Sequence, residues 1–161
     1  GYPEGFAAGT AFNQLADSLQ VISSHLEPHD IKVAVEPLNK SETNIINNID
    51  DGIALMEAVD RGNIRLLVDF YHFSVEEDSE ASLRQALAAN YVIHVHIAEP
   101  PGRTYPLKRH QKLEDFIAII QQAGYSGRLS IEACFAGSTN DPQGDMAAAY
   151  PVLRSILDGQ D

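Results

Sequence analysis

The sequence predicts an α/β fold and, within that class, a partial (β/α)8 barrel with about four parallel strands. Four short runs are β-branched or aliphatic, as strands buried in a parallel sheet are. Amphipathic helical patterns alternate with these runs. Each run ends on Glu, Asp or His, and in a βα barrel the carboxyl ends of the strands face the active site. The 161 residues are 44% hydrophobic, which predicts one domain, 1–161, with its own core.

The first predicted element is a helix over residues 10–26. Its apolar residues recur at three- and four-residue spacing, which is typical of an amphipathic helix. They are Phe12, Leu15, Leu19, Ile22 and Leu26. The segment 27–30, Glu-Pro-His-Asp, interrupts this pattern, and residues 31–36 form the first predicted strand.

The remainder of the chain repeats a strand and a helix. Asp50 or Asp51 is expected to cap the next helix, which Gly62 ends, and Gly124 is a typical left-handed helix terminator. Pro151 predicts a kink or a late start in the last helix. The predicted helices cover 50–59, 79–90, 113–123 and 145–157, and the predicted strands cover 65–69, 92–96 and 128–132.

Alternating strands and helices require a parallel sheet, for which two architectures compete. An open doubly wound sheet usually carries a Gly-rich phosphate-binding loop, and no such loop follows any of these runs. A complete (β/α)8 barrel usually needs at least about 200 residues, and this chain has strands for half of one. We therefore expect half a barrel, equivalent to α(βα)4.

Composition narrows the classes of partner and compartment. A net charge of −12 argues against nucleic acid, because phosphate binding needs clustered Lys and Arg. The lone Cys134 excludes an intrachain disulfide framework and is expected to be a small buried side chain. No apolar stretch approaches the roughly 20 residues of a membrane span, and the first residues do not resemble a signal peptide. The expectation is a cytoplasmic protein that contacts no membrane.

Four donor side chains end the four predicted strands: Glu36, Asp69, His96 and Glu132. Any one of them alone has an ordinary structural explanation, such as a salt bridge or a loop cap. Together they predict a divalent metal site, because the carboxyl ends of parallel strands meet at one rim. Three carboxylates and an imidazole suit Mn²⁺, Mg²⁺ or Co²⁺ better than structural zinc. His94 is expected to point to the other side of its strand and to have a packing role.

Several motifs resemble the sugar isomerase/epimerase superfamily, the xylose-isomerase-like TIM barrels. They are Val-Glu-Pro-Leu-Asn-Lys-Ser-Glu over 35–42, Asp-Phe-Tyr-His over 69–72, His-Val-His-Ile-Ala-Glu over 94–99, and Ile-Glu over 131–132. The pattern is most like that of D-tagatose/D-psicose 3-epimerases and hydroxypyruvate-isomerase-like proteins. The resemblance implies that the chain is the C-terminal half of the barrel, with strands five to eight.

The same resemblance implies roles for individual residues. The metal ligands of the family fall on the four donors above, and Mn²⁺ is the first choice of ion. The sugar-contacting residues fall on Glu42, His72 and Arg103. The chain departs from the family pattern at Lys40, where an arginine is usual, and at Glu132-Ala133, where Glu-Pro is common. The loop over 103–112 and the missing strands one to four are further departures.

The implied reaction moves a hydrogen at or between neighbouring carbons of a ketose through an enediolate. Glu36 and Glu132 would be the catalytic pair, one removing the proton and the other returning it. Return to the opposite face of the same carbon is epimerisation, and return to the neighbouring carbon is isomerisation. Arg103 and His72 would orient and polarise the sugar oxygens, while Glu42 would bind a hydroxyl.

Two alternatives remain at this stage. An endonuclease-IV-like apurinic endonuclease shares the Asp-x-x-His motif, although Lys108 stands where that family needs an acidic ligand. A catalytically inert half barrel is the other. Because exposed edge strands invite pairing, we also predict a homodimer or higher oligomer, whose extreme form is two copies closing one barrel.

Overall fold

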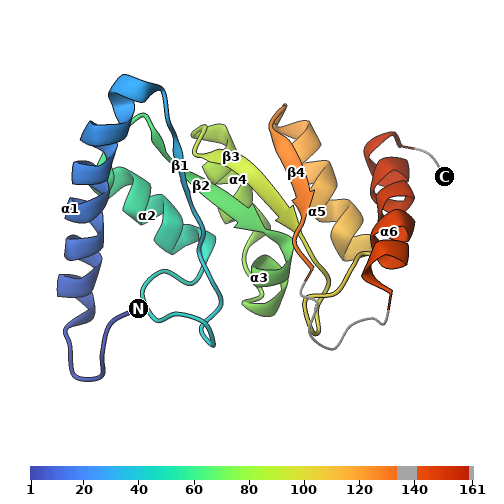
Figure 1. Ribbon diagram of the computed structural model, residues 1–161, viewed down its shortest axis with the longest axis horizontal. Coiled ribbons are helices and arrows are strands. Elements are labelled where there is room, and N and C mark those ends of the chain that lie inside the picture. The colour runs from blue at the N-terminus through green and yellow to red at the C-terminus, as the bar shows by residue number, and fades with distance from the viewer. Residues whose placement is uncertain (134–140, 160–161) are drawn as a thin grey trace.

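The computed structural model describes residues 1–133 and 141–159 (Figure 1). The helices are α1 (Ala8–Leu26), α2 (Ile49–Val59), α3 (Phe70–Val75), α4 (Glu80–Ala88), α5 (Gln111–Gln122) and α6 (Pro142–Leu157), with a short 3-10 helix η1 (Glu27–His29). The strands are β1 (Val33–Val35), β2 (Ile64–Asp69), β3 (Val92–Ile97) and β4 (Arg128–Ile131). The predicted order of elements is confirmed, apart from α3, which was not expected.

The four strands form one parallel sheet in the order β1-β2-β3-β4. Sequence neighbours are therefore neighbours in the sheet, which is the arrangement of a barrel wall and not of a doubly wound sheet. Across the picture, α1 lies at one end and α6 at the other, beyond β4, with α2, α4 and α5 between them in that order (Figure 1). Within the described residues, β1 and β4 are the edges of the sheet.

A continuous core joins the sheet to its helices. Leu55 and Val59 of α2, Val95 of β3 and Phe116 of α5 are almost completely buried in it. Each such side chain contributes roughly 1.5–3 kcal/mol through removal of its surface from water. The apolar patterns in the sequence located these elements correctly because the apolar faces of the helices and the strands pack against one another in this core.

Most differences between the predicted and the observed helices lie at their ends. Asn48, and not Asp50 or Asp51, caps α2, because its side chain accepts a hydrogen bond from the Asp51 N–H at 2.8 Å. The last helix begins at Pro142 and runs through Pro151, so the expectation of a late start was wrong. Asp141 accepts from the Gly144 N–H and stabilises that earlier start.

Gly124 and the lengths of the helices bear on two further predictions. Gly124 has φ of +71° directly after the end of α5, which confirms its role as a terminator. None of the helices in the described ranges is long and apolar enough to cross a bilayer. Cys134 lies outside the described residues.

Candidate metal and substrate site

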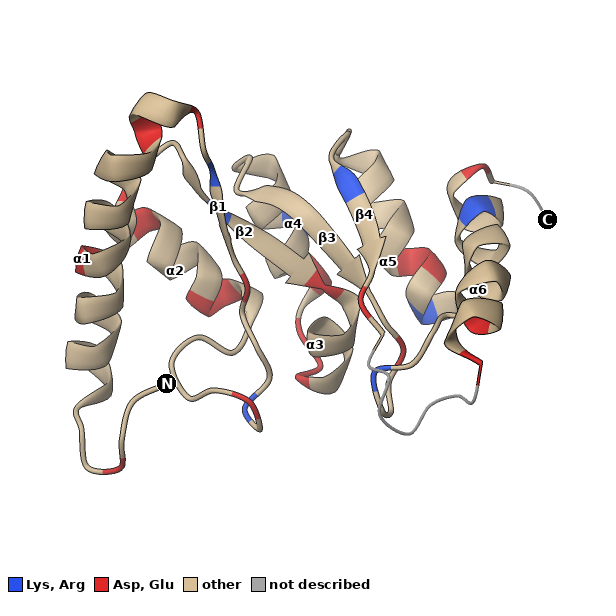
Figure 2. Cartoon of the chain, in the orientation of Figure 1, with Lys and Arg blue, Asp and Glu red and all other residues tan. Residues whose placement is uncertain are grey.

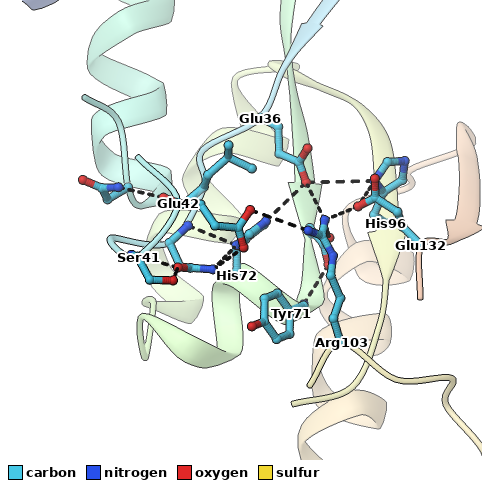
Figure 3. A network of polar contacts seen from close by, with 12 residues as sticks. Glu36, Ser41, Glu42, Tyr71, His72, His96, Arg103 and Glu132 are labelled. Carbon is cyan, nitrogen blue, oxygen red and sulfur yellow. Dashed lines mark hydrogen bonds and ion pairs between the residues drawn. The ribbon is translucent and has the colours of Figure 1, made fainter. Parts of the chain in front are cut away.

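The four strand-end donors lie together at the carboxyl edge of the sheet. Asp69 is the last residue of β2 and pairs in register with His96 of β3. Glu36 directly follows β1, and Glu132 follows β4, where its N–H donates to the Ile97 carbonyl at 3.1 Å. One ligand atom from each of the four lies within 4.8 Å of the others. Figure 3 shows Glu36, His96 and Glu132 converging beside Arg103.

The side chain of Asp69 is oriented toward the site because it also caps the helix that follows β2. One oxygen, Oδ1, accepts a hydrogen bond from the Tyr71 N–H at 2.8 Å and so caps α3. The other, Oδ2, lies 3.1 Å from Arg103 Nη2 inside the cluster. The side chain is fully buried, with 0% exposure. Because each oxygen has a partner of its own, the orientation of this side chain is fixed.

Burial and mutual repulsion disturb the protonation of the carboxylates. Burial, together with the neighbouring charges of Asp69 and Glu132, raises the pKa of Glu36 from 4.5 to about 7 against an opposing effect of Arg103. Burial also raises the pKa of Asp69, although the Tyr71 N–H and Arg103 act in the other direction. Figure 2 shows acidic segments where β1, β2 and β4 end. The site is thus short of positive charge.

Arg103 supplies part of that charge from the loop after β3. Its guanidinium contacts Asp69 and Glu132 and lies 3.9 Å from Glu36 Oε1. It also lies 3.7 Å from Glu42 Oε2, and its Cζ is 5.4 Å from the centre of the Tyr71 ring. The predicted substrate residue Arg103 therefore lies within reach of all the carboxylates of the cluster.

His72 and Glu42 complete the set of predicted site residues. His72 is buried on α3, and its Nε2 lies 3.8 Å from Glu36 Oε1. Burial lowers the pKa of His72. Glu42 lies in the loop after β1, with Oε2 toward Arg103 and Oε1 accepting from Asn39 Nδ2 at 2.8 Å. All seven predicted residues are thus brought to one end of the sheet.

Lys40 lies outside the donor cluster, and His94 departs from the expectation for it. Lys40, which replaces the usual arginine, is 72% exposed and pairs with Glu76 at 2.8 Å, away from the donor cluster. The expectation that His94 points to the other side of its strand was wrong, because residues two apart on a strand share a face. Its ring lies 4.9 Å from that of His96, and its Nε2 lies 3.0 Å from Ser130 Oγ.

The donor set fits a divalent cation. Glu36 Oε1 is buried and has no hydrogen-bond partner among the described residues, and His96 Nδ1, also buried, has the Glu132 carboxylate near it, with Oε2 at 3.2 Å. Such atoms are costly unless something coordinates them. Ligands about 2.1–2.3 Å from one ion lie at most about 4.2–4.6 Å apart, close to the spacing of this cluster. Three carboxylates and one imidazole are a suitable set for Mn²⁺, Mg²⁺ or Co²⁺.

Asn39 is a site residue that the sequence analysis did not single out. It is 1% exposed and contacts both His72 and Glu42. Its position inside the Leu-Asn-Lys-Ser-Glu segment was the available signal, since a buried polar residue next to a strand end needs partners.

The fold and the site define a partial TIM barrel with a candidate metal centre at the carboxyl ends of its strands. Residues 1–156 match the family model of the xylose isomerase-like TIM barrel, and the chain belongs to that family. This confirms the resemblance and the fold class predicted from the sequence.

Several named relatives are sugar epimerases. The chain is 30% identical over 143 residues to an L-ribulose 3-epimerase of Methylomonas sp. (strain DH-1), covering 88% of this chain and 48% of that protein. It is 25% identical over 145 residues to a D-psicose 3-epimerase of Ruminiclostridium cellulolyticum, covering 90% and 47%. A crystal structure of D-psicose 3-epimerase in the presence of D-fructose shares the fold, with a TM-score of 0.80 at 19% identity over 98% of this chain and 60% of that one. The chain spans about half the length of the curated relatives it matches.

Proposed function

We propose that this chain carries the metal centre of a divalent-metal-dependent ketose epimerase or isomerase. The observation that carries the proposal is the convergence of four donor atoms, from four neighbouring strands, within 4.8 Å of one another. The similarity to ketose 3-epimerases supports a sugar as the substrate class.

In this proposal, Glu36, Asp69, His96 and Glu132 hold one ion, with Mn²⁺ as the first choice and Mg²⁺ or Co²⁺ as alternatives. A bound ion would act as a Lewis acid toward the carbonyl and a neighbouring hydroxyl of the sugar. The buried Glu36 Oε1, which has no hydrogen-bond partner among the described residues, supports the assignment, because coordination would satisfy it. Asp69 contributes Oδ2, since Oδ1 is engaged in capping α3.

Glu36 and Glu132 are the proposed proton-transfer pair. They follow β1 and β4, at opposite edges of the sheet, and so approach a bound ketose from different sides. One glutamate removes the C–H proton next to the carbonyl, giving an enediolate, and the other delivers a proton to it.

The remaining residues orient the sugar. Arg103 presents a planar set of N–H donors beside Glu36 and Glu42, suited to hydroxyl and carbonyl oxygens. His72 directs Nε2 toward the same space. Glu42 keeps Oε2 on that side while Asn39 holds Oε1, so it can accept a hydrogen bond from a sugar hydroxyl.

The proposal is tested first by metal binding, which needs no turnover. Titration calorimetry with Mn²⁺ is expected to give one ion per chain, with strong loss of affinity in Glu36→Gln and Glu132→Gln. The control Glu57→Gln, which changes an exposed carboxylate of α2, is expected to bind as the wild type does. Absence of binding in the wild type refutes the metal centre, and two or three ions per chain favour the endonuclease alternative.

The reaction is tested by interconversion of ketoses such as D-psicose and D-fructose. Loss of turnover in both glutamine variants is expected. Wild-type turnover in either variant excludes the two-glutamate mechanism. An inert chain that binds one Mn²⁺ would retain the metal centre and remove the catalytic proposal.

A further inference from the structure

Asn39 organises the loop between β1 and α2 at the edge of the site. Its backbone carbonyl accepts from the N–H groups of Glu42 and Thr43, at 2.9 and 3.2 Å. Its side chain contacts Ser41, Glu42 and His72. A buried amide with this many partners is fixed in both position and orientation.

The partners also define which amide atom is which. The Ser41 N–H can only donate, so the atom 3.0 Å from it is the oxygen Oδ1. The Glu42 carboxylate lies 2.8 Å from the other atom, which is therefore the nitrogen Nδ2. Exchanging the two would place an N–H against an N–H and an oxygen against a carboxylate, so the observed orientation is strongly favoured.

This orientation determines the role of one nitrogen of His72. Asn39 presents two donors to His72 Nδ1, its backbone N–H and its Nδ2, each at 3.0 Å. Neither group can accept a hydrogen bond. Nδ1 must therefore be the unprotonated acceptor, and the single proton of the neutral ring must lie on Nε2.

The protonated nitrogen faces the candidate site. His72 Nε2 is buried, lies 3.8 Å from Glu36 Oε1, and has no hydrogen-bond partner among the residues that the structure describes. An N–H in this position is available to an oxygen atom that enters beside Glu36.

We propose that Asn39 is a positioning residue, which holds His72 as the Nε2–H tautomer so that His72 donates a hydrogen bond to a ligand oxygen and does not remove a proton. The identification of that ligand as a sugar rests on the proposed function, whereas the tautomer does not. With His72 fixed as a donor, proton removal falls to the carboxylates. The same amide holds Glu42, so one side chain sets the direction of two sugar-facing groups.

The tautomer can be measured directly by long-range ¹H–¹⁵N correlation of the histidine rings at about pH 8, above the ordinary histidine pKa. The His72 signals are assigned by their loss in His72→Gln. In the wild type we expect a non-protonated Nδ1 and a protonated Nε2. In Asn39→Asp, where an acceptor oxygen replaces the Nδ2 donor, we expect the Nδ1 signal to shift toward the protonated form.

Asn47→Asp is the matched control, because it makes the same chemical change in the same loop. Its Nδ2 donates to the carbonyls of Leu38 and Thr43, and not to His72. We expect its His72 signals to match the wild type. If Asn39→Asp does not fold, Asn39→Ala replaces it; the backbone N–H of residue 39 still donates to Nδ1 there, so a partial loss of the Nε2–H tautomer is expected.

The proposal is overturned by a protonated Nδ1 in the wild type, or by folded Asn39 variants that keep the wild-type tautomer. These results do not depend on turnover, so they separate this proposal from the proposed function. Where ketose turnover is measurable, Asn39→Asp is expected to lower kcat/KM by about 10–100-fold, as loss of a residue that orients a site residue typically does. Asn47→Asp should leave it near the wild-type value.

Discussion

The pH dependence of stability tests the buried carboxylate cluster most directly. The folded chain holds the Glu36 proton up to a pKa of about 7, whereas an unfolded glutamate releases it near 4.5. Between these values the folded state binds more protons than the unfolded state, so the free energy of unfolding falls as pH rises. The difference of about 2.5 pH units, at about 1.4 kcal/mol per unit, predicts a total loss of about 3.5 kcal/mol in the absence of metal, of which about 3 kcal/mol falls between pH 4.5 and 8.

Urea denaturation with chelator present, at several pH values from about 4.5 to 8, measures this loss. Glu36→Gln should remove about 3 kcal/mol of the pH dependence, and the surface control Glu57→Gln should retain it. Comparing each variant with the wild type cancels the opposite contribution of His72 and His94, whose lowered pKa values add stability as pH rises toward 6.5. If the free energy of unfolding of the wild type has the same pH dependence as that of Glu36→Gln, the argument that burial raises the pKa of Glu36 is refuted.

Three further predictions concern metal affinity, core packing and self-association. Arg103→Gln should raise Mn²⁺ affinity by about tenfold in calorimetry, because it removes a cation that contacts Asp69. Arg109→Gln, which removes an arginine paired with Glu114, is the control. Unchanged affinity in Arg103→Gln contradicts the reasoning. Leu55→Ala should lower the free energy of unfolding by about 2–5 kcal/mol in urea, and a smaller loss means that Leu55 is not a core residue. Light scattering after size exclusion should give a dimer or larger species that Tyr150→Arg disrupts, since Tyr150 is 64% exposed beside β4; a wild-type monomer refutes self-association.

The alternation of elements was predictable because each has a strong internal pattern. The strand over 64–69 is a short, nearly continuous buried run, and the helix over 111–122 buries apolar residues at helical spacing. Helix α3 was missed because it is a single short helix that starts directly at Asp69 and has no amphipathic period of its own. Its formation depends on the Asp69 cap and on packing of Phe70 and Phe73 against Phe116, which are tertiary effects.

The site was predictable where a strand end fixes the position of a residue. Asp69 and His96 come together because parallel register places them side by side. The contacts of Arg103 with Asp69 and Glu132 come from a loop, whose path no periodicity describes. The role of Asn39 depends on the contact with His72, 33 residues further along the chain, so no local pattern could reveal it.

The cluster argues for a cation independently of any sugar. Four donors from four consecutive strands converge, and their mutual repulsion and burial raise the pKa values of Glu36 and Asp69. A structural salt-bridge network would instead pair each carboxylate with its own cation and lower those values. One arginine, shared among several carboxylates, does not neutralise them. A divalent ion at the same place would supply two positive charges and would satisfy the buried Glu36 Oε1, which a second arginine of fixed fork geometry would not do.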